Sequence, residues 1–408
     1  MKGARFLIAM TLLGMLLVSI GTAGDWPQWR GVDRDGKAVD FKAPAAWPER
    51  LQEKWRATVG SGDSTPALVG ERLYVFTRQG DEETTLCLNA ATGEVVWTDK
   101  YAAKAVTGAA SRHPGPRSSP AVAEGKVVTL GVGGVVSCLS AADGKMIWRK
   151  DPFEGAVPRF FTSMSPIVVD GMAIVHAGTA GKGAILAYNL ADGAEKWRWD
   201  GEGPDYASPA FLAVGGVKQI VTLAEKSIVA VAAGDGKLLW QLPFAPTGRA
   251  YNAATPIVDG DTVIYTGAGR GTFAVKIEKQ GDAFEAKPLW SNPDIATQYN
   301  TPVLKDGMLF GMSSGGNLFC INAKDGKTAW IDAVSRDRSG FGTIVDGGSV
   351  LLALPSSGEM LVYKPTAEGY SQIVAVKVGA ASTYGYPVVT DSRIFVKDEN
   401  TVALYVAD

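Results

Sequence analysis

A repeat with two interleaved markers constrains the fold of this chain more than any other feature. The first marker is a Ser/Thr-Pro step followed by a short apolar run and a glycine turn, and the second is a turn of the Asp-Gly-Lys kind followed by a tryptophan. Successive copies lie 40 to 54 residues apart, close to the length of a four-stranded propeller blade. The first marker occurs at Pro66, Pro120, Pro166, Pro209, Pro256, Pro302 and, after a tyrosine, Pro387, with a degenerate copy at residues 342–347. The second marker ends at Trp97, Trp148, Trp197, Trp240, Trp330 and, without the Asp-Gly turn, Trp290.

The unit at residues 119–150 can be followed strand by strand. Pro120 begins the first strand, where its missing N–H does least harm. Turns at residues 124–126, 133–134 and 143–145 then separate three further short apolar runs. An Asp-Gly step between such runs is a strong hairpin signal. Four short antiparallel strands with no helix between them predict a β-propeller.

Counting the units gives eight blades. The last marker, Pro387, is followed by residues 388–406, which suffice for only three strands. The missing fourth strand is expected at residues 51–59, around Trp55, so that an N-terminal strand completes the C-terminal blade. Such closure removes the free sheet edges that invite aggregation. The sequence therefore predicts an all-β, eight-bladed propeller of four-stranded antiparallel blades.

The N-terminal segment has the features of a secretory signal. Lys2 and Arg5 precede an apolar-to-small run at residues 6–20, and residues 21–23 (Gly-Thr-Ala) supply the small residues of a cleavage site. The run is shorter than the roughly 20 residues that a membrane span needs. The expected organisation is a cleaved signal peptide at 1–23, an N-terminal arm at 24–50 and the propeller at 51–408.

The same segment bears on localisation. A lipoprotein signal needs a cysteine at the cleavage point, and the first cysteine of this chain is Cys87. The mature protein is therefore expected to be periplasmic or otherwise exported, without a lipid anchor and without a transmembrane segment. Trp26, Trp29 and Trp47 suggest that the arm docks on the propeller, and whether it covers one end of the channel stays open at this point.

Composition excludes several chemistries. Cleavage would remove two positive charges and take the formal net charge from −2 to −4, which is not the charge of a nucleic-acid binder. Two histidines and three cysteines leave little for a zinc site or a Cys/His catalytic pair. His176 lies in an apolar run and is expected in the core. His113 lies in an irregular basic loop and is either a contact residue or a solvated one. No catalytic and no metal-binding residue is predicted.

Two segments resemble a known family. Residues 90–97, Ala-Ala-Thr-Gly-Glu-Val-Val-Trp, are similar to the Ala-x-x-Gly-x-x-x-Trp repeat of pyrroloquinoline quinone (PQQ)-type β-propellers. Residues 25–31, Asp-Trp-Pro-Gln-Trp-Arg-Gly, resemble a segment of bacterial exported PQQ-like proteins, many of which are grouped with BamB, the propeller component of the outer-membrane β-barrel assembly machinery. The resemblance covers essentially the whole mature chain. It implies the propeller fold and leaves two functions open, because the family holds both quinone dehydrogenases and non-catalytic scaffolds.

The dehydrogenase branch implies a disulfide between two adjacent cysteines beside the quinone, and a calcium ion held by acidic and amide side chains. Cys87, Cys138 and Cys320 are instead scattered, each six residues before a turn glycine. The corresponding residues of two other blades are Ala187 and Ala230, which indicates a small, buried strand position. Buried thiols in such a position are packing groups. No cofactor is therefore expected, and PQQ lacks the support of a vicinal cysteine pair.

The loops just before each first strand are the strongest candidate surface. Every blade enters its first strand from the same side, so these loops should gather at one mouth of the channel. Arginines and aromatics dominate binding sites, and gathered arginines in an acidic protein would favour an acidic peptide, an anionic glycan or a carboxylate. The alternative, that the rings only pack between blades, is equally compatible with the sequence. The candidate residues are Arg117, Arg159, Phe161, Tyr206, Arg249, Tyr251, Tyr299, Arg338, Phe341 and Tyr384.

These observations predict a non-catalytic, exported propeller that binds a protein or an anionic polymer on its channel face. The preference follows because the sequence supplies no nucleophile, no base with an orienting partner and no metal cluster. The alternative is a PQQ-dependent dehydrogenase, or another redox enzyme, that has replaced the cysteine pair. Copurification of a quinone that absorbs in the near-ultraviolet would reverse this order.

Overall fold

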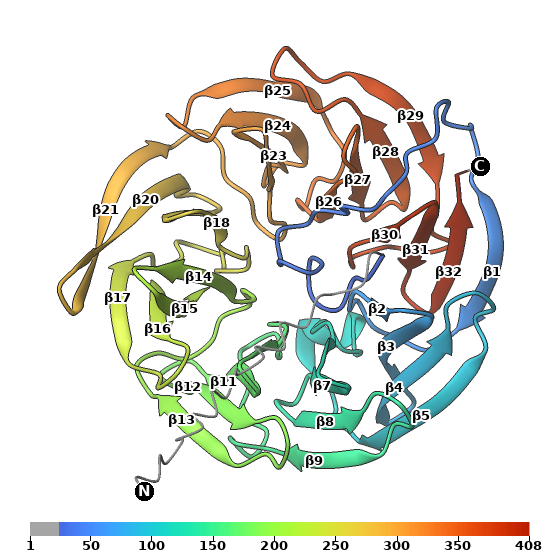
Figure 1. Cartoon of the computed structure of the whole chain (residues 1–408). Helices are drawn as coiled ribbons and strands as arrows, with labels where there is room; N and C mark the ends of the chain where they lie inside the picture. The colour runs from blue at the N-terminus through green and yellow to red at the C-terminus, as the bar shows by residue number, and fades with distance from the viewer. Residues whose placement is uncertain (1–23, 408) are drawn as a thin grey trace, which may run out of the picture.

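The computed structural model describes residues 24–407, which form 32 strands and one short 3-10 helix, η1 (Gly108–Arg112). The strands make eight four-stranded antiparallel sheets, arranged as blades around a central channel (Figure 1). The predicted eight-bladed β-propeller is confirmed. The predicted signal peptide at residues 1–23 lies outside the described residues. Within residues 24–407, no helix has the length and apolar character needed to cross a membrane.

Seven blades are built from consecutive strands, with the first strand at the channel and the fourth at the rim (Figure 1). Blades 1 to 4 are β2 (Ala67–Val69), β3 (Arg72–Gln79), β4 (Glu82–Asn89) and β5 (Val95–Ala102); β6 (Ala121–Ala123), β7 (Lys126–Leu130), β8 (Val136–Ser140) and β9 (Met146–Lys150); β10 (Ile167–Val169), β11 (Met172–Thr179), β12 (Lys182–Asn189) and β13 (Glu195–Trp199); and β14 (Ala210–Val214), β15 (Val217–Leu223), β16 (Ser227–Ala232) and β17 (Leu238–Pro243). Blades 5 to 7 are β18 (Ile257–Asp259), β19 (Thr262–Gly267), β20 (Gly271–Gln280) and β21 (Ala283–Asn292); β22 (Val303–Lys305), β23 (Met308–Met312), β24 (Asn317–Asn322) and β25 (Thr328–Ser335); and β26 (Gly342–Asp346), β27 (Leu351–Pro355), β28 (Glu359–Tyr363) and β29 (Gln372–Lys377).

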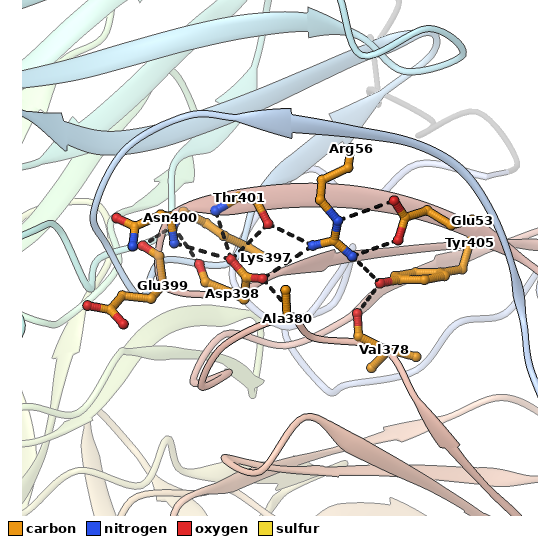
Figure 2. Close-up of polar contacts among 10 residues, drawn as sticks. All are labelled: Glu53, Arg56, Val378, Ala380, Lys397, Asp398, Glu399, Asn400, Thr401 and Tyr405. Carbon is orange, nitrogen blue, oxygen red and sulfur yellow. Dashed lines mark hydrogen bonds and ion pairs between the residues drawn. The ribbon is translucent and has the colours of Figure 1, made fainter.

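Blade 8 joins the two ends of the chain. β1 pairs antiparallel with β32, from Gln52 opposite Val406 to Thr58 opposite Thr401. The predicted fourth strand around Trp55 is thus confirmed. Figure 2 shows the polar network that links β1 to β32 and to the turn before it. The strands of blade 8 are β30 (Val388–Thr390), β31 (Arg393–Lys397), β32 (Thr401–Val406) and, at the rim, β1 (Gln52–Thr58).

The Ser/Thr of the first sequence marker links neighbouring blades around the channel. Its hydroxyl accepts a hydrogen bond from the backbone N–H of the equivalent residue in the preceding blade. The proline that follows fixes φ and brings no N–H of its own. The marker therefore recurs because it connects the inner circle of the propeller. Such bonds, 2.7–3.0 Å long, run from Tyr386 to Thr65, Thr65 to Ser119, Ser119 to Ser165, Ser165 to Ser208 and Thr255 to Thr301.

The recurring tryptophan packs between blades. Trp97, for example, covers the turn glycine of the next blade, Gly144, and its Nε1–H donates to the Ala141 carbonyl at 3.1 Å. Trp240 differs because in the next blade β20 and β21 stay paired as far as Gln280 and Ala283, past the place of the turn, and its indole donates instead to Gln219 of its own blade. Equivalent donor–acceptor pairs are Trp55 with Ala90, Trp148 with Leu190, Trp197 with Ala233, Trp290 with Ala323 and Trp330 with Thr366.

Replacing Gly144 by alanine should destabilise the propeller more than the same change at Gly125. Both glycines have a positive φ, +73° and +69°, so both substitutions carry backbone strain of about 1–2 kcal/mol. Only at Gly144 would the new Cβ also meet the Trp97 ring, because nothing lies within 4 Å of the Gly125 position. We expect Gly144→Ala to lower the free energy of unfolding by about 3 kcal/mol in urea denaturation. Equal losses in the two variants would contradict the packing of Trp97 on this turn.

All three cysteines are free and buried, at the small strand position that the sequence predicted. Cys138, for example, lies opposite Trp148 in the pairing of β8 with β9. Burial raises the pKa of Cys138 to about 12, so the thiol stays protonated at neutral pH. The position is small because the tryptophan lies directly across from it. Equivalent pairs are Cys87 with Trp97, Cys320 with Trp330, Ala187 with Trp197 and Ala230 with Trp240.

Candidate functional site

A cavity of about 490 Å³ opens at the end of the channel where the first strands begin. This volume lies within the range of ligand pockets, about 300–1,000 Å³. Every blade contributes at least one large side chain or charged group to the cavity wall from the loop before its first strand. In blade order these residues are Asp63, Arg117, Phe160, Tyr206, Tyr251, Tyr299, Phe341 and Tyr384.

Six successive blades place aromatic rings in the wall, and these rings form two arcs. Within the first arc the ring centroids lie 5.4–6.3 Å apart. In the second arc Tyr299 stacks on Phe341 at 4.2 Å, and Phe341 meets Tyr384 edge-on at 5.2 Å. The rings therefore pack against neighbouring blades and line the cavity at the same time. The first aromatic arc is Phe160, Tyr206 and Tyr251, and the second aromatic arc is Tyr299, Phe341 and Tyr384.

Blades 1 and 2 make the remaining part of the wall polar. His113, from the loop ahead of Arg117, places Nδ1 3.2 Å from Asp63 Oδ2 and its ring edge-on to Tyr384. The Arg117 guanidinium donates to the backbone carbonyls of His113 and Phe160, both at 2.8 Å. Burial lowers the pKa of Arg117. His113, which from the sequence was either a contact residue or a solvated one, lies in the cavity lining.

The His113–Asp63 pair should make stability depend weakly on pH. The hydrogen bond to Asp63 raises the pKa of His113, against a smaller lowering by burial. Such a histidine stabilises the protein fully below its unfolded pKa of about 6.5, and this contribution is lost as pH rises through the folded pKa. Between about pH 5.5 and about pH 8.5, wild type should lose more stability than His113→Gln. The difference should stay under about 1 kcal/mol, because the imidazole is 35% exposed. Urea unfolding at both pH values measures it, and identical pH dependence would argue against the pair.

Seven of the ten predicted mouth residues line the cavity, and three do not. Phe161 is buried in an apolar cluster, because the turn that ends there gives it a φ of +67°, and Phe160 takes its place in the wall. Arg159 is exposed, with its guanidinium 5.3 Å from the Phe160 ring centroid. Arg338 is exposed outside the lining. The seven that line the cavity are Arg117, Tyr206, Arg249, Tyr251, Tyr299, Phe341 and Tyr384.

Arg249 is the cation of the wall that has no internal partner. It is exposed, and it reaches the cavity from the loop that also carries Tyr251 of the first arc. No hydrogen bond or ion pair joins it to another residue of the described part, 24–407. The Asp63 carboxylate is matched by His113, and Arg117 donates only to carbonyl oxygens. The cavity therefore carries a surplus of positive charge.

The N-terminal arm forms the floor of the cavity. It enters and leaves the channel at the opposite face, where Asp25 accepts from Gly70 N–H after β2 and Lys42 N–H donates to Asp391 after β30. Trp29, from within the arm, lines the cavity, and its indole donates to Thr255 at 2.9 Å. Figure 1 shows the arm, in blue, at the centre of the ring. The arm thus covers one end of the channel, a point that the sequence alone did not decide.

Two buried arginines hold the arm on the channel axis. Arg30 and Arg34 are 1% and 4% exposed, and neither donates to a carboxylate of the described residues. Arg34 donates to the carbonyl oxygens of Ser165, Pro166 and Pro209 at 2.7–3.2 Å. Burial, and then the charge of Arg30, lowers the pKa of Arg34 to about 9, which leaves it charged at neutral pH. The acceptors of Arg30 are the carbonyl oxygens of Arg34, Asp35, Thr301 and Pro302 and the hydroxyl of Tyr386.

Arg30 and Arg34 were not predicted from the sequence. The arm occurs once, so no repeat register marks its residues, and the one available signal was the family-like segment at residues 25–31. The structure shows that the arm contacts all eight blades, in or directly beside their first strands. In blade order the contacts are Trp26 with Leu68, Pro27 with Val122, Arg34 with Pro166, Arg34 with Pro209, Trp29 with Thr255, Arg30 with Pro302, Ala38 with Asp346 and Lys42 with Asp391.

The cavity does not match the quinone arrangement that the dehydrogenase branch implies. The three cysteines lie inside blades, and none of them lines the cavity. Asp63 is the one carboxylate of the lining, and His113 engages it. Within residues 24–407, no group of three or more His, Cys, Asp or Glu side chains is placed to hold a metal ion. His176, the second histidine, is buried in the core as predicted, at 2% exposure.

The chain is similar to one protein family and to several solved propellers. Residues 83–332 match the family model described as outer membrane protein assembly factor BamB. The outer membrane protein assembly factor BamB of Yersinia pestis is 25% identical over 369 residues, covering 85% of this chain and 80% of that protein. The quinohemoprotein alcohol dehydrogenase of Comamonas testosteroni is 28% identical over 140 residues, covering 34% of this chain and 19% of that protein.

Solved structures give the same fold. The crystal structure of BamB from Moraxella catarrhalis has a TM-score of 0.65 and 14% identity, and covers 87% of this chain and 97% of that chain. The quinohemoprotein alcohol dehydrogenase of Comamonas testosteroni has a TM-score of 0.70 and 15% identity, with 94% and 80% covered. At these identities the structural likeness shows the propeller fold alone.

Proposed function

This chain belongs to the family described as outer membrane protein assembly factor BamB, and we propose that it is a non-catalytic scaffold that binds a protein partner at the mouth of its channel. The cavity wall carries this proposal, because all eight blades direct a residue into one mouth and six of these residues are aromatic. Aromatic residues and arginines are the usual anchors of protein partners. Arg249 adds a cation without an internal partner.

The hydroxyl groups of the lining support a non-catalytic role. Ser208 and Thr301 accept backbone N–H bonds that link neighbouring blades, and Ser163 donates to the Tyr206 carbonyl. None of the three is hydrogen-bonded to a histidine or carboxylate that could activate it as a nucleophile. A dehydrogenase would be favoured instead if the purified protein bound PQQ with calcium saturably and gained thermal stability.

The proposal includes export by a cleaved signal peptide at residues 1–23. Cleavage after Ala23 would leave the arm intact, because the Gly24 N–H donates to Asp40 at 2.8 Å and the contacts of the arm with the blades lie beyond it. We expect the periplasmic fraction to contain a chain that begins at Gly24 and carries no lipid, and the intact mass of the purified protein measures this. A mass that includes residues 1–23, or an added acyl group, would contradict it.

A gene deletion in the source bacterium tests the proposed function. Loss of the protein should lower the amount of folded β-barrel protein in the outer membrane, measured by heat-modifiable mobility on gels. Wild type and Arg338→Gln should restore it, whereas the double variant Arg249→Gln with Phe341→Ala should not. Arg338→Gln should keep the melting temperature of wild type. The double variant, which loses a ring packed on Tyr299 and Tyr384, should melt lower but still accumulate as folded protein in the same amount as wild type. Unchanged barrel content after deletion, or full rescue by the double variant, would contradict binding through this mouth.

A further inference from the structure

The aromatic rings and the unpaired arginine of the cavity limit which side chains of a partner can bind there. We infer that it accepts an aromatic side chain of the partner together with a neighbouring carboxylate, an inference that rests on the proposed function. The second aromatic arc offers the contact surface. Tyr299 and Phe341 stack almost parallel, at 7° and 4.2 Å, and Tyr299 is 37% exposed. Because these two rings are already stacked on each other, they lose little conformational entropy when a further ring packs on them.

The floor of the cavity is aromatic as well. The Trp29 indole is fixed by its bond to Thr255 and by an edge-on contact with Tyr386, with centroids 5.0 Å apart. Walls and floor therefore present ring faces and edges that are set before a ligand arrives. Aromatic side chains prefer offset and edge-to-face contacts with other rings. An inserted phenyl or indole group would find both kinds of partner here.

The charges of the cavity point to a carboxylate beside that ring. Asp63 is paired with His113, and Arg117 donates only to backbone carbonyls. Arg249, exposed in the loop before the first strand of blade 5, has a guanidinium that no described residue engages. A guanidinium binds a carboxylate through two parallel hydrogen bonds, which is among the strongest polar contacts that proteins make.

The balance of rings and charges favours a single aromatic–acidic pair over a polyanion. The lining has six aromatic rings in its walls but only two arginines. A polyanion would need a row of cations along its length, whereas an uncharged ring would leave Arg249 without a partner. The volume of about 490 Å³ suits one side chain with its neighbour and not a folded domain.

Peptides titrated into the mature protein, residues 24–408, test the inference by isothermal calorimetry. The probe is acetyl-Gly-Phe-Asp-Gly-amide, and its controls carry alanine for phenylalanine or asparagine for aspartate. Each control should bind about tenfold more weakly. Arg249→Gln should weaken the Phe-Asp probe about tenfold and abolish its advantage over Phe-Asn. Arg338→Gln, a matched change of an exposed arginine outside the lining, should leave binding unchanged.

Several outcomes would overturn the inference. They are no measurable binding of the probe, equal binding of all three peptides, equal losses in the two arginine variants, or tighter binding of polyglutamate or an anionic polysaccharide. Melting temperatures of the variants separate a lost contact from a misfolded chain. Failure with the peptides while gene deletion still lowers barrel protein would reject the aromatic–acidic ligand alone. Peptide binding without an effect of gene deletion on barrel protein would reject the proposed function but support the aromatic–acidic binding site.

Discussion

Replacing Arg34 by methionine should release the N-terminal arm and lower the free energy of unfolding by about 3–5 kcal/mol. Arg34 is 4% exposed and donates to the carbonyls of Ser165, Pro166 and Pro209, in blades 3 and 4. Methionine fills much of the space but has no donor, so these buried carbonyls lose a partner at about 1–3 kcal/mol each. Urea unfolding measures the loss, and trypsin cleavage after Lys37 measures the release of the arm.

Two further variants make this expectation specific. Lys42 also lies in the arm, but its side chain is 80% exposed and pairs with Asp391 at 3.5 Å, so Lys42→Met should cost under about 1 kcal/mol. Arg34→Lys keeps the charge but replaces the planar fork by one ammonium group, and its stability should be intermediate. If Arg34→Met is as stable and as resistant to trypsin as Lys42→Met, the arm is not held through Arg34.

Release of the arm should also remove ligand binding in the cavity. Trp29 lies five residues before Arg34 and forms the cavity floor. An arm that leaves the channel takes this floor with it, although Trp29 itself is unchanged in the variant. We expect Arg34→Met to lose binding of the Phe-Asp peptide, measured by calorimetry. If Arg34→Met still binds the peptide, the cavity walls are sufficient for binding without the Trp29 floor.

The fold was predictable from the sequence because each marker makes a contact that every blade needs. Trp97 recurs since it must cover the turn glycine of the next blade, and the Ser/Thr before proline recurs since it links the inner strands. The exceptions follow the same logic. Trp240 bonds within its own blade, because the long β20–β21 hairpin of the next blade has no turn at that place. Because every blade must make the same contact, the same residue recurs in every unit of the sequence. A comparison of the units within one chain therefore detects it.

The site was predictable only in part. The loops were located by their position just before the repeated proline of each blade. Seven of the ten candidates, such as Tyr299 and Arg249, line the cavity. Direction within a loop depends on local dihedrals, so the positive φ of Phe161 buried that ring and left Phe160 in the wall. Arg34 could not be found, because its partners in the blades are backbone carbonyls, which leave no trace in the sequence, and its one side-chain partner, Gln28, lies in the arm itself.

Replacing Asp398 by alanine should open blade 8 and lower the free energy of unfolding by about 3–4 kcal/mol. Asp398 is 3% exposed and lies in the turn between β31 and β32. It accepts the backbone N–H groups of Ala380, Asn400 and Thr401 at 2.8–3.2 Å, and Arg56 Nη1 of β1 at 3.3 Å (Figure 2). Alanine leaves these donors unpaired in a buried place and removes the carboxylate from the charge of Arg56. The shift of the urea midpoint measures the loss.

The contribution of Asp398 should also disappear in acid. Burial alone would raise the pKa of Asp398, but hydrogen bonds from Thr401 and from backbone N–H groups outweigh it and hold the pKa below its ordinary value. An acid whose folded pKa is depressed stabilises the protein above its unfolded pKa of about 3.9, and this stabilisation is lost as pH falls through the folded pKa. Below about pH 4, the free energy of unfolding of wild type should therefore fall toward that of Asp398→Ala, which lacks this contribution at every pH. The difference between their urea midpoints should shrink accordingly.

A variant at Glu53 distinguishes two contributions of Asp398, its bonds to the buried turn and its pairing with the charge of Arg56. Glu53 pairs with the same guanidinium at 2.7 Å, but its side chain is 40% exposed (Figure 2). Exposed ion pairs contribute about 0–1 kcal/mol, so Glu53→Ala should cost far less than Asp398→Ala. The difference between the two variants then measures the buried N–H groups that only Asp398 satisfies. Equal losses would mean that closure depends on neutralising Arg56, and that the turn between β31 and β32 holds its shape without the carboxylate.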